Sequence, residues 1–147
     1  MSAKDGFETN LLRHIFQNAN IVNVGDSTGL RGSSSAGSLY VALYTVAPSD
    51  SSEGTECTTS NYGGYARVAV ARSTAGWAVS GNNASNASAI VFPQCTGNSC
   101  TVAGFAIHTA STGTGNQIIW GTLSPTLSVS NGITPQFAAG AMDIFLD

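Results

Sequence analysis

The sequence predicts an all-β protein, a sandwich or jelly roll of about eight strands with one amphipathic helix at its N-terminus. Short apolar runs alternate with turn residues at regular spacing, and helical periodicity is convincing only in the first twenty residues. Charged residues make up 9% of the 147 residues, against about 25% in typical soluble domains. The chain instead contains 19 Ser, 15 Thr and 11 Asn. This composition excludes a coiled coil or helical bundle, whose outer faces need charge.

The N-terminal helix is expected within residues 1–20. Asp5 and Glu8 have the spacing of a capping box, and Asn18 suits the exit. One helical face carries Phe7, Leu11, Leu12, Ile15, Phe16 and Ala19. Two interpretations of this face stay open: it packs on the protein's own sheet, or it docks on a neighbouring subunit. In the second case the expected interface residues are Phe7, Leu11, Ile15, Phe16 and Arg31.

Residues 21–38 are rich in Gly and Ser without periodicity, which predicts a loop or arm. Residues 39–147 are expected to form the β-sandwich, and the whole chain a single domain. Leu39–Val46 is apolar on both faces and therefore predicts a central strand covered on both sides. The further expected strands are Gly64–Arg72, Trp77–Val79, Ala89–Phe92, Thr101–Thr109, Ile118–Leu123, Leu127–Val129, Ile133–Phe137 and Ala141–Leu146.

Two turn signals stand out among these strands. Gly113–Asn116 predicts a glycine-rich turn before Ile118. Asn131-Gly132 lies between Leu127–Val129 and Ile133–Phe137, and Asn-Gly is the strongest short-range hairpin signal. We therefore expect Leu127–Val129 and Ile133–Phe137 to pair as a hairpin.

Three cysteines are present, Cys57, Cys95 and Cys100. The four residues between Cys95 and Cys100 have turn chemistry, and a hairpin there would bring the two thiols near disulfide distance. Cys95 and Cys100 are therefore either a disulfide pair or, as is usual for a chain made in cytoplasm, two reduced cysteines flanking a turn. The spacing does not match a zinc site.

We find no catalytic motif and expect neither an enzyme nor a cofactor. His14 and His108 lack a sequence signature for a nucleophilic partner. Carboxylates for glycoside hydrolysis would have to come from Asp26, Asp50, Glu53, Glu56 or Asp143. Three of these share the polar segment 48–61, which favours simple solvation over catalysis or calcium binding.

The net charge of −3 and the five scattered basic residues argue against nucleic-acid binding. No apolar run approaches the ~20 residues that span a bilayer, so no membrane association is expected. Charged residues interrupt the apolar pattern of the first sixteen residues, unlike a secretory signal, so synthesis in cytoplasm is expected. Low charge and abundant hydroxyls favour permanent contact with other protein.

Several segments together resemble a family of small virion proteins of tailed bacteriophages, and the resemblance covers most of the chain from Leu39 onward. The segments are Leu39–Thr45 with Ala47–Asp50, Gly63–Val70, Asn86–Pro93, Ile119–Leu123, Val129–Gly132, Pro135–Ala141 and Ile144–Asp147. The chain departs from the family pattern at Cys95–Cys100 and at Asp143. Members of this family are commonly labelled tail-fibre proteins, and some similar small β-proteins cement or decorate the head.

The resemblance implies a structural virion protein, and our first interpretation is a capsid cement protein. It would bind the outer capsid surface, bridge subunits of the major capsid protein and form a homo-oligomer, a dimer in preference to a trimer. It would be made in the cytoplasm of the host bacterium. The alternative is a tail-fibre accessory or receptor-binding module, in which Tyr62, Tyr65 or Trp77 could stack on sugars. A remote third interpretation is a polysaccharide hydrolase that uses Glu53 or Glu56.

Overall fold

The computed structural model describes residues 3–113 and 117–146. These residues form two compact units. The first unit combines residues 3–38, 70–90 and 137–146, and the second combines residues 39–69, 91–113 and 117–136. Each unit therefore draws on segments that are far apart in the sequence. That the chain folds as a single domain stays a prediction.

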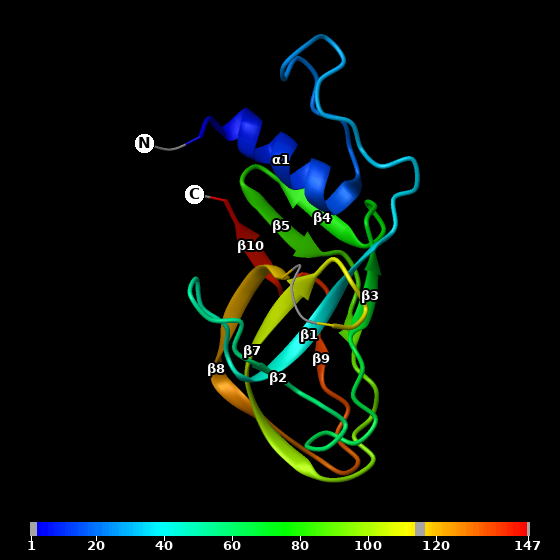
Figure 1. Ribbon diagram of the computed structural model, residues 1–147, viewed down its shortest axis with the longest axis vertical. Helices are drawn as coiled ribbons and strands as arrows, with labels where there is room; N and C mark the ends of the chain where they lie inside the picture. The colour runs from blue at the N-terminus through cyan, green and yellow to red at the C-terminus, as the bar shows by residue number, and fades with distance from the viewer. Residues whose placement is uncertain (1–2, 114–116, 147) are drawn as a thin grey trace. The chain divides into compact units, whose positions relative to one another are not determined.

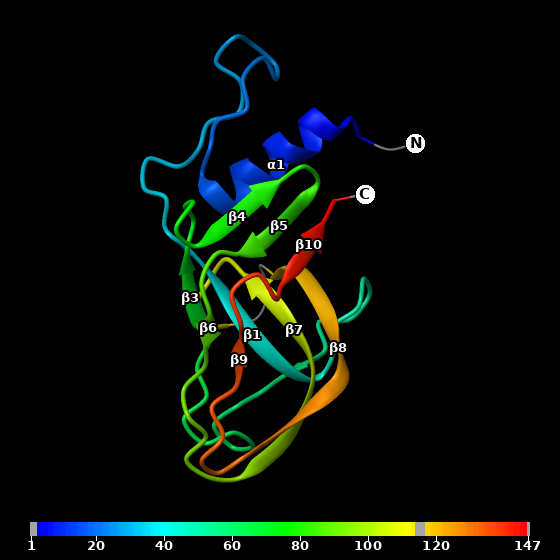
Figure 2. The same cartoon turned by 180° about the vertical axis from the view of Figure 1, so that it is seen from behind.

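The first unit consists of a helix on a small antiparallel sheet. Helix α1 (Asp5–Gln17) contacts β4 (Trp77–Ser80) and β5 (Asn83–Asn86), and β10 (Asp143–Phe145) completes the sheet in the order β10-β5-β4 (Figures 1 and 2). Strand β5 was missed in the sequence because its four residues, Asn-Ala-Ser-Asn, have low β-propensity. Its place between two partner strands decides its conformation instead.

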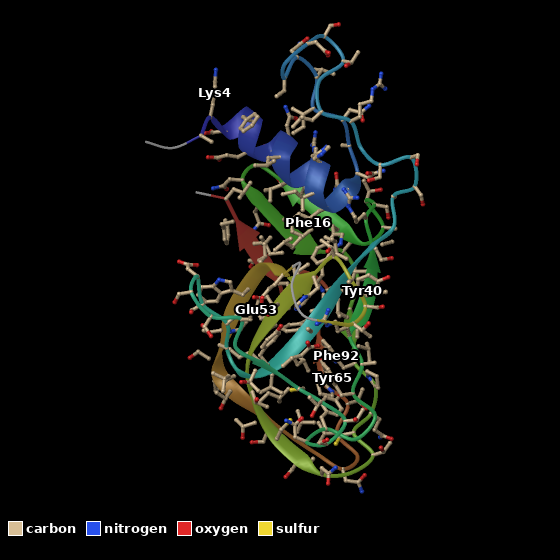
Figure 3. All side chains as sticks on the ribbon, in the orientation of Figure 1. Lys4, Phe16, Tyr40, Glu53, Tyr65 and Phe92 are labelled. Carbon is tan, nitrogen blue, oxygen red and sulfur yellow. The ribbon has the colours of Figure 1, made fainter. Side chains whose placement is uncertain are left out.

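The core of the first unit is an aromatic contact between Phe16 and Trp77. Their ring centroids lie 4.8 Å apart, and neither side chain is exposed to solvent. Phe16 lies on the side of α1 that faces the sheet (Figure 3). The side-chain amide of Gln17 donates a hydrogen bond to the backbone carbonyl of Trp77. These contacts anchor the last turn of α1 to β4.

Helix α1 differs from its prediction at its start and in its buried face. Its N-cap is Lys4, without a side-chain capping bond, so the capping box expected from Asp5 and Glu8 is wrong. The buried residues are Glu8, Leu12 and Phe16. The buried stripe is thus narrower than the apolar face, and Phe7 lies outside it. Asn18 ends the helix in the left-handed conformation, as expected.

The second unit is built on a five-stranded antiparallel sheet. Its order is β2 (Thr55–Glu56), β1 (Ser38–Val46), β7 (Ser99–His108) and β8 (Gln117–Ser130), and β3 (Val68–Ala71) also pairs with β1. Strand β1 pairs with β7 from Tyr40–His108 to Tyr44–Gly104. The prediction of a central strand covered on both sides is confirmed, because Val41 to Tyr44 are all buried.

Strand β8 joins two segments that the sequence separates. It runs through Ile118–Leu123 and Leu127–Val129 as one strand of 14 residues, with a cis Ser124–Pro125 peptide bond between them. It pairs with β7 on one side and ends the strand order of the sheet. Because successive side chains of a strand point to opposite faces, Ile118 and Trp120 share one face, and both are exposed.

The turn at Asn131-Gly132 is present, but the hairpin expected around it is wrong. Gly132 adopts a φ of +88°, and the Ile133 amide donates to the Ser130 carbonyl. The end of β8 pairs with the start of β7 instead of with the next strand. That next strand, β9 (Gln136–Phe137), pairs with β6 (Ile90–Val91). A local turn signal could not reveal this distant partner.

The fold class is confirmed: the structure is mostly antiparallel β-sheet with one short N-terminal helix, as expected for an all-β sandwich. Strand boundaries differ more. Only Val68–Ala71 of the expected strand Gly64–Arg72 is extended, and β2 forms inside the expected polar loop. The predicted turn Gly113–Asn116 lies outside the described residues except for Gly113. Within the described chain, no helix has the length and apolarity to cross a bilayer.

Candidate ligand-binding groove

A groove of about 370 Å³ lies in the second unit, between β8 and the loop that follows β1. Its volume falls within the roughly 300–1,000 Å³ typical of small-ligand sites. Its lining residues are Ser49, Asp50, Ser51, Ser52, Glu53, Gln117, Ile118 and Trp120. The loop side of the groove thus carries two carboxylates and serine hydroxyls, and the β8 side carries an amide and two apolar side chains. Figure 3 labels Glu53, on the loop beside β8.

The polar side of the groove is a tight turn. Ser49 and Ser52 form an isolated antiparallel bridge, and the amide of each residue donates to the carbonyl of the other. The pairing places Asp50 and Ser51 at the tip of the turn, with Glu53 directly after it. Backbone hydrogen bonds therefore hold two carboxylates on one short segment.

Two glycines let this loop lie close to the sheet. A side chain at Gly104 of β7 would approach the Cβ of Ala47 to 2.7 Å, so a larger residue there would push the loop away. Gly54 has a φ of +70°, and a Cβ there would collide with the Val46 carbonyl oxygen. Only glycine readily combines this conformation with such a close return of the chain.

The Gln117 amide, on the β8 side of the groove, is hydrogen-bonded to a buried tyrosine. Gln117 Nε2 donates to the Tyr44 hydroxyl at 3.3 Å, and that hydroxyl is hydrogen-bonded to His108 Nε2 at 2.9 Å. The Tyr44 and His108 rings are stacked. Burial, with a smaller contribution from the charge of Glu56, raises the pKa of Tyr44 to about 12. The phenol therefore stays protonated at neutral pH and can support Gln117.

A second polar cluster lies around Arg67 and is held together by internal hydrogen bonds. Arg67 makes two hydrogen bonds to the Glu56 carboxylate, at 2.8 and 2.7 Å, and further ones to the carbonyls of Ala110 and Gly113. Tyr65 donates to the same carboxylate at 2.8 Å. Burial alone would raise the pKa of Glu56, but the bonds from Arg67 and Tyr65 outweigh it and lower the pKa. The cluster fixes the loop after β7, and a second pocket, of about 430 Å³, lies against it.

The structure separates the residues predicted as an interface. Phe16 is fully buried, so its prediction as an interface residue is wrong; it packs on Trp77 instead. Leu11 and Ile15 are partly buried, whereas Phe7 and Arg31 are exposed. An apolar helical face could not reveal which of its residues the sheet covers.

Residues 21–38, expected to be a loop or arm, contain a loop closed by backbone hydrogen bonds. Ile21 and Leu30 form an antiparallel bridge with two hydrogen bonds of 2.8 Å. The Asp26 carboxylate accepts bonds from Thr28 and Gly29, which lower its pKa. Three apolar side chains of this loop are exposed: Val22, Val24 and Leu30. In Figures 1 and 2 the loop extends beyond α1.

The aromatic residues that the receptor-binding alternative would use for sugar stacking are not available for it. Tyr62 and Trp77 are completely buried, and Tyr65 is partly buried with its hydroxyl bonded to Glu56. Trp120 is 39% exposed at the groove instead. Side chains along Ile118-Ile119-Trp120 alternate between the two faces of the sheet. The sequence alone could not tell whether the face that carries the indole is exposed.

The carboxylates considered for glycoside hydrolysis lie in separate parts of the structure. Asp50 and Glu53 line the groove together, whereas Glu56 belongs to the Arg67 cluster. Asp26 closes its own loop, and Asp143 accepts a hydrogen bond from the Asn83 side chain. Among the described residues, no group of three or more acidic, histidine or cysteine side chains is arranged to hold a metal ion.

The three cysteines are free thiols in this structure. The hairpin expected between Cys95 and Cys100 is wrong, because Cys100 pairs with Val129 of β8 and the Cys95 amide donates to the Ile133 carbonyl. Both Cys57 and Cys95 lie near enough to the Cys100 thiol to influence its pKa. Burial raises the pKa of the Cys57 and Cys100 thiols, which makes them poor nucleophiles at neutral pH.

Comparison with known proteins gives one family. A family model described as "Podophage GP4 fiber I protein gp80" matches residues 3–144. The match thus includes the helix, both units and the strands that line the groove. No curated protein matches the chain.

Proposed function

The chain belongs to the podophage GP4 fiber I protein gp80 family, and from this premise we propose that it is a tail-fibre protein of a podophage. Membership of this family supports a structural role in the phage virion. The observation that carries the proposal is the extent of the match, because it spans nearly the whole chain rather than one shared module. The proposed place of the protein is the tail of the particle.

The second candidate is the capsid cement protein suggested by the sequence. Exposed apolar side chains favour it, because Phe7 on α1 and Val22, Val24 and Leu30 on the following loop suit contact with another protein. The partner would be the major capsid protein, on the outer surface of the shell. In either role we propose a homo-oligomer, with Phe7 and Arg31 rather than Phe16 in its interface.

We propose a role in binding and assembly rather than in catalysis. Glu56, which the polysaccharide hydrolase interpretation names beside Glu53, is hydrogen-bonded to Arg67 and Tyr65. Its lowered pKa makes it a poor general acid. Two of the five basic side chains, Arg67 and Arg72, are committed to internal hydrogen bonds. This supports the expectation that the protein does not bind nucleic acid.

An amber mutation in the gene tests the tail role against the capsid role. Particles made in a non-suppressing host are expected to keep full, stable heads and to lose adsorption to host cells. Supply of the wild-type protein from a plasmid should restore adsorption. If the particles adsorb normally but their heads lose DNA on warming, the protein is a cement and the fibre proposal fails.

A further inference from the structure

The groove beside Trp120 has the chemistry of a sugar-binding site. A sugar ring has an apolar face of C–H groups and a rim of hydroxyls, so proteins bind it with an exposed aromatic ring beside hydrogen-bonding groups. Trp120 and Ile118 are exposed on the same face of β8 and line one side of the groove. In the β7–β8 register Trp120 lies opposite the small side chain of Ala106. The indole is therefore only partly covered by its own sheet.

The opposite side of the groove supplies acceptors in a fixed arrangement. Asp50 and Glu53 carry carboxylates that can accept two hydrogen bonds from neighbouring hydroxyls, and the serines between them add hydroxyl groups. The backbone bonds between Ser49 and Ser52 hold this segment, and on the β8 side Tyr44 holds the amide of Gln117. Such preorganisation lowers the entropic cost of binding.

The negative charge of the groove favours neutral sugars over anionic ones. Its lining includes two carboxylates and no Lys, Arg or His among the described residues. A phosphate, a uronic acid or a sialic acid would meet repulsion without a compensating cation. A neutral hexose, 6-deoxyhexose or N-acetylated sugar can donate its hydroxyl protons to the same carboxylates.

We propose that this groove binds a neutral sugar unit of a bacterial surface polysaccharide, with Trp120 stacking on the ring and Asp50 and Glu53 accepting from its hydroxyls. This inference rests on the proposed tail-fibre function, since a fibre at the tail meets the host surface. It assigns receptor contact to the edge strand β8 and to the turn at residues 49–53.

Tryptophan fluorescence gives a direct test with the intact 147-residue chain. The chain has two tryptophans, and Trp77 is fully buried, so quenching by added acrylamide reports mainly on Trp120. The probes are methyl glycosides of glucose, galactose, mannose, rhamnose and N-acetylglucosamine, with polygalacturonate as the anionic comparison. Purified lipopolysaccharide and purified capsular polysaccharide of the host distinguish the two sources of neutral sugar.

Binding of at least one neutral probe should shift the emission to shorter wavelength and protect Trp120 from acrylamide. Trp120→Ala should weaken binding, followed by calorimetry, by about tenfold or more, the effect of losing roughly 1.4 kcal/mol. Trp120→Phe should retain most of the affinity, and Glu53→Gln should weaken it. Phe145→Ala, which removes an exposed aromatic outside the groove, is the matched control and should bind as wild type.

Three results would overturn the inference: no binding of any neutral probe or host polysaccharide, unchanged binding by Trp120→Ala, or preferred binding of polygalacturonate. Unchanged melting temperatures would show that the variants are folded. The adsorption phenotype of the amber mutant is independent of these titrations. A tail protein whose groove binds no sugar would therefore refute this inference alone, and a head protein would refute the proposed function.

Discussion

Arg67 and Arg72 show how single residues set local structure on either side of β3. Arg67 uses its guanidinium to join Glu56 to the loop carbonyls of Ala110 and Gly113. Arg72 donates to the carbonyls of His14 and Ile15 in the last turn of α1, at 2.7 Å each. A cation at this end of a helix satisfies carbonyls that lack partners within the helix. Both arginines therefore act as internal cross-links.

The Glu56–Arg67 pair gives a prediction at this scale. Arg67 has 3% of its side chain exposed, so Glu56→Gln leaves a nearly buried cation without its partner charge. We expect the substitution to lower the free energy of unfolding at pH 7 by about 1–3 kcal/mol, measured by urea denaturation. Glu53→Gln, at an exposed position on the preceding loop, is the control and should change it by less than about 0.5 kcal/mol.

The same pair makes stability depend on pH. The pKa of Glu56 is lower in the folded chain than its usual value, so the unfolded chain takes up the proton first as pH falls. The contribution of Glu56 is present above about pH 4.3, the usual pKa of glutamate, and is lost as pH falls through the lower folded pKa. Wild type should therefore lose more stability than Glu56→Gln below that pH. An equal loss in both proteins would contradict the assignment.

Residue types predicted some of these roles and missed others. The left-handed exit at Asn18 follows from local conformational preference, which the sequence contains. The role of Arg67 depends on Glu56, 11 residues away, and on carbonyls more than 40 residues away. The exposure of Trp120 depends on what the loop after β1 covers. Neither fact is encoded in a local pattern.

Among the secondary-structure elements, α1 shows most clearly how one apolar face contains both buried and exposed side chains. Leu12 and Phe16 are fully buried, whereas Phe7 is 44% exposed. Helical periodicity identified the element and its apolar residues, but it could not divide that face between packing on the protein's own sheet and contact with a neighbouring subunit. The sheet β10-β5-β4 covers only part of that face. The central strand β1 was easier to predict because both of its faces are apolar.

Substitutions on α1 test this division. Phe16→Ala is expected to lower the free energy of unfolding by about 3–5 kcal/mol, because it removes the ring contact with Trp77 and leaves a cavity in the core. Phe7→Ala should change it by no more than about 0.5 kcal/mol. If Phe7 belongs to the oligomer interface, Phe7→Asp should lower the mass measured by light scattering while the melting temperature stays unchanged. Comparable destabilisation by Phe7→Ala and Phe16→Ala would contradict the assignment of the buried face.

At the scale of the whole molecule, the strand pattern and the composition of the sequence predicted the fold class and the kind of surface. Short apolar runs between turns predicted an all-β protein, and this fold class is confirmed. Low charge and many hydroxyl and amide residues predicted a surface suited to contact with other protein. The pairing of β6 with β9, and of both ends of β8 with β7, could not be predicted because these contacts join distant segments. The resemblance to small phage virion proteins is consistent with the family match, while the choice between head and tail depends on the particle itself.

Localisation of the protein on intact particles tests the central claim most directly. Antibodies against the purified chain, coupled to colloidal gold, would be bound to purified virions and viewed by electron microscopy, with amber-mutant particles as the control. The tail-fibre proposal predicts gold at the tail of wild-type particles and none on the mutant. Gold distributed over the capsid surface, or wild-type particles without label and without the polypeptide by mass spectrometry, would contradict it.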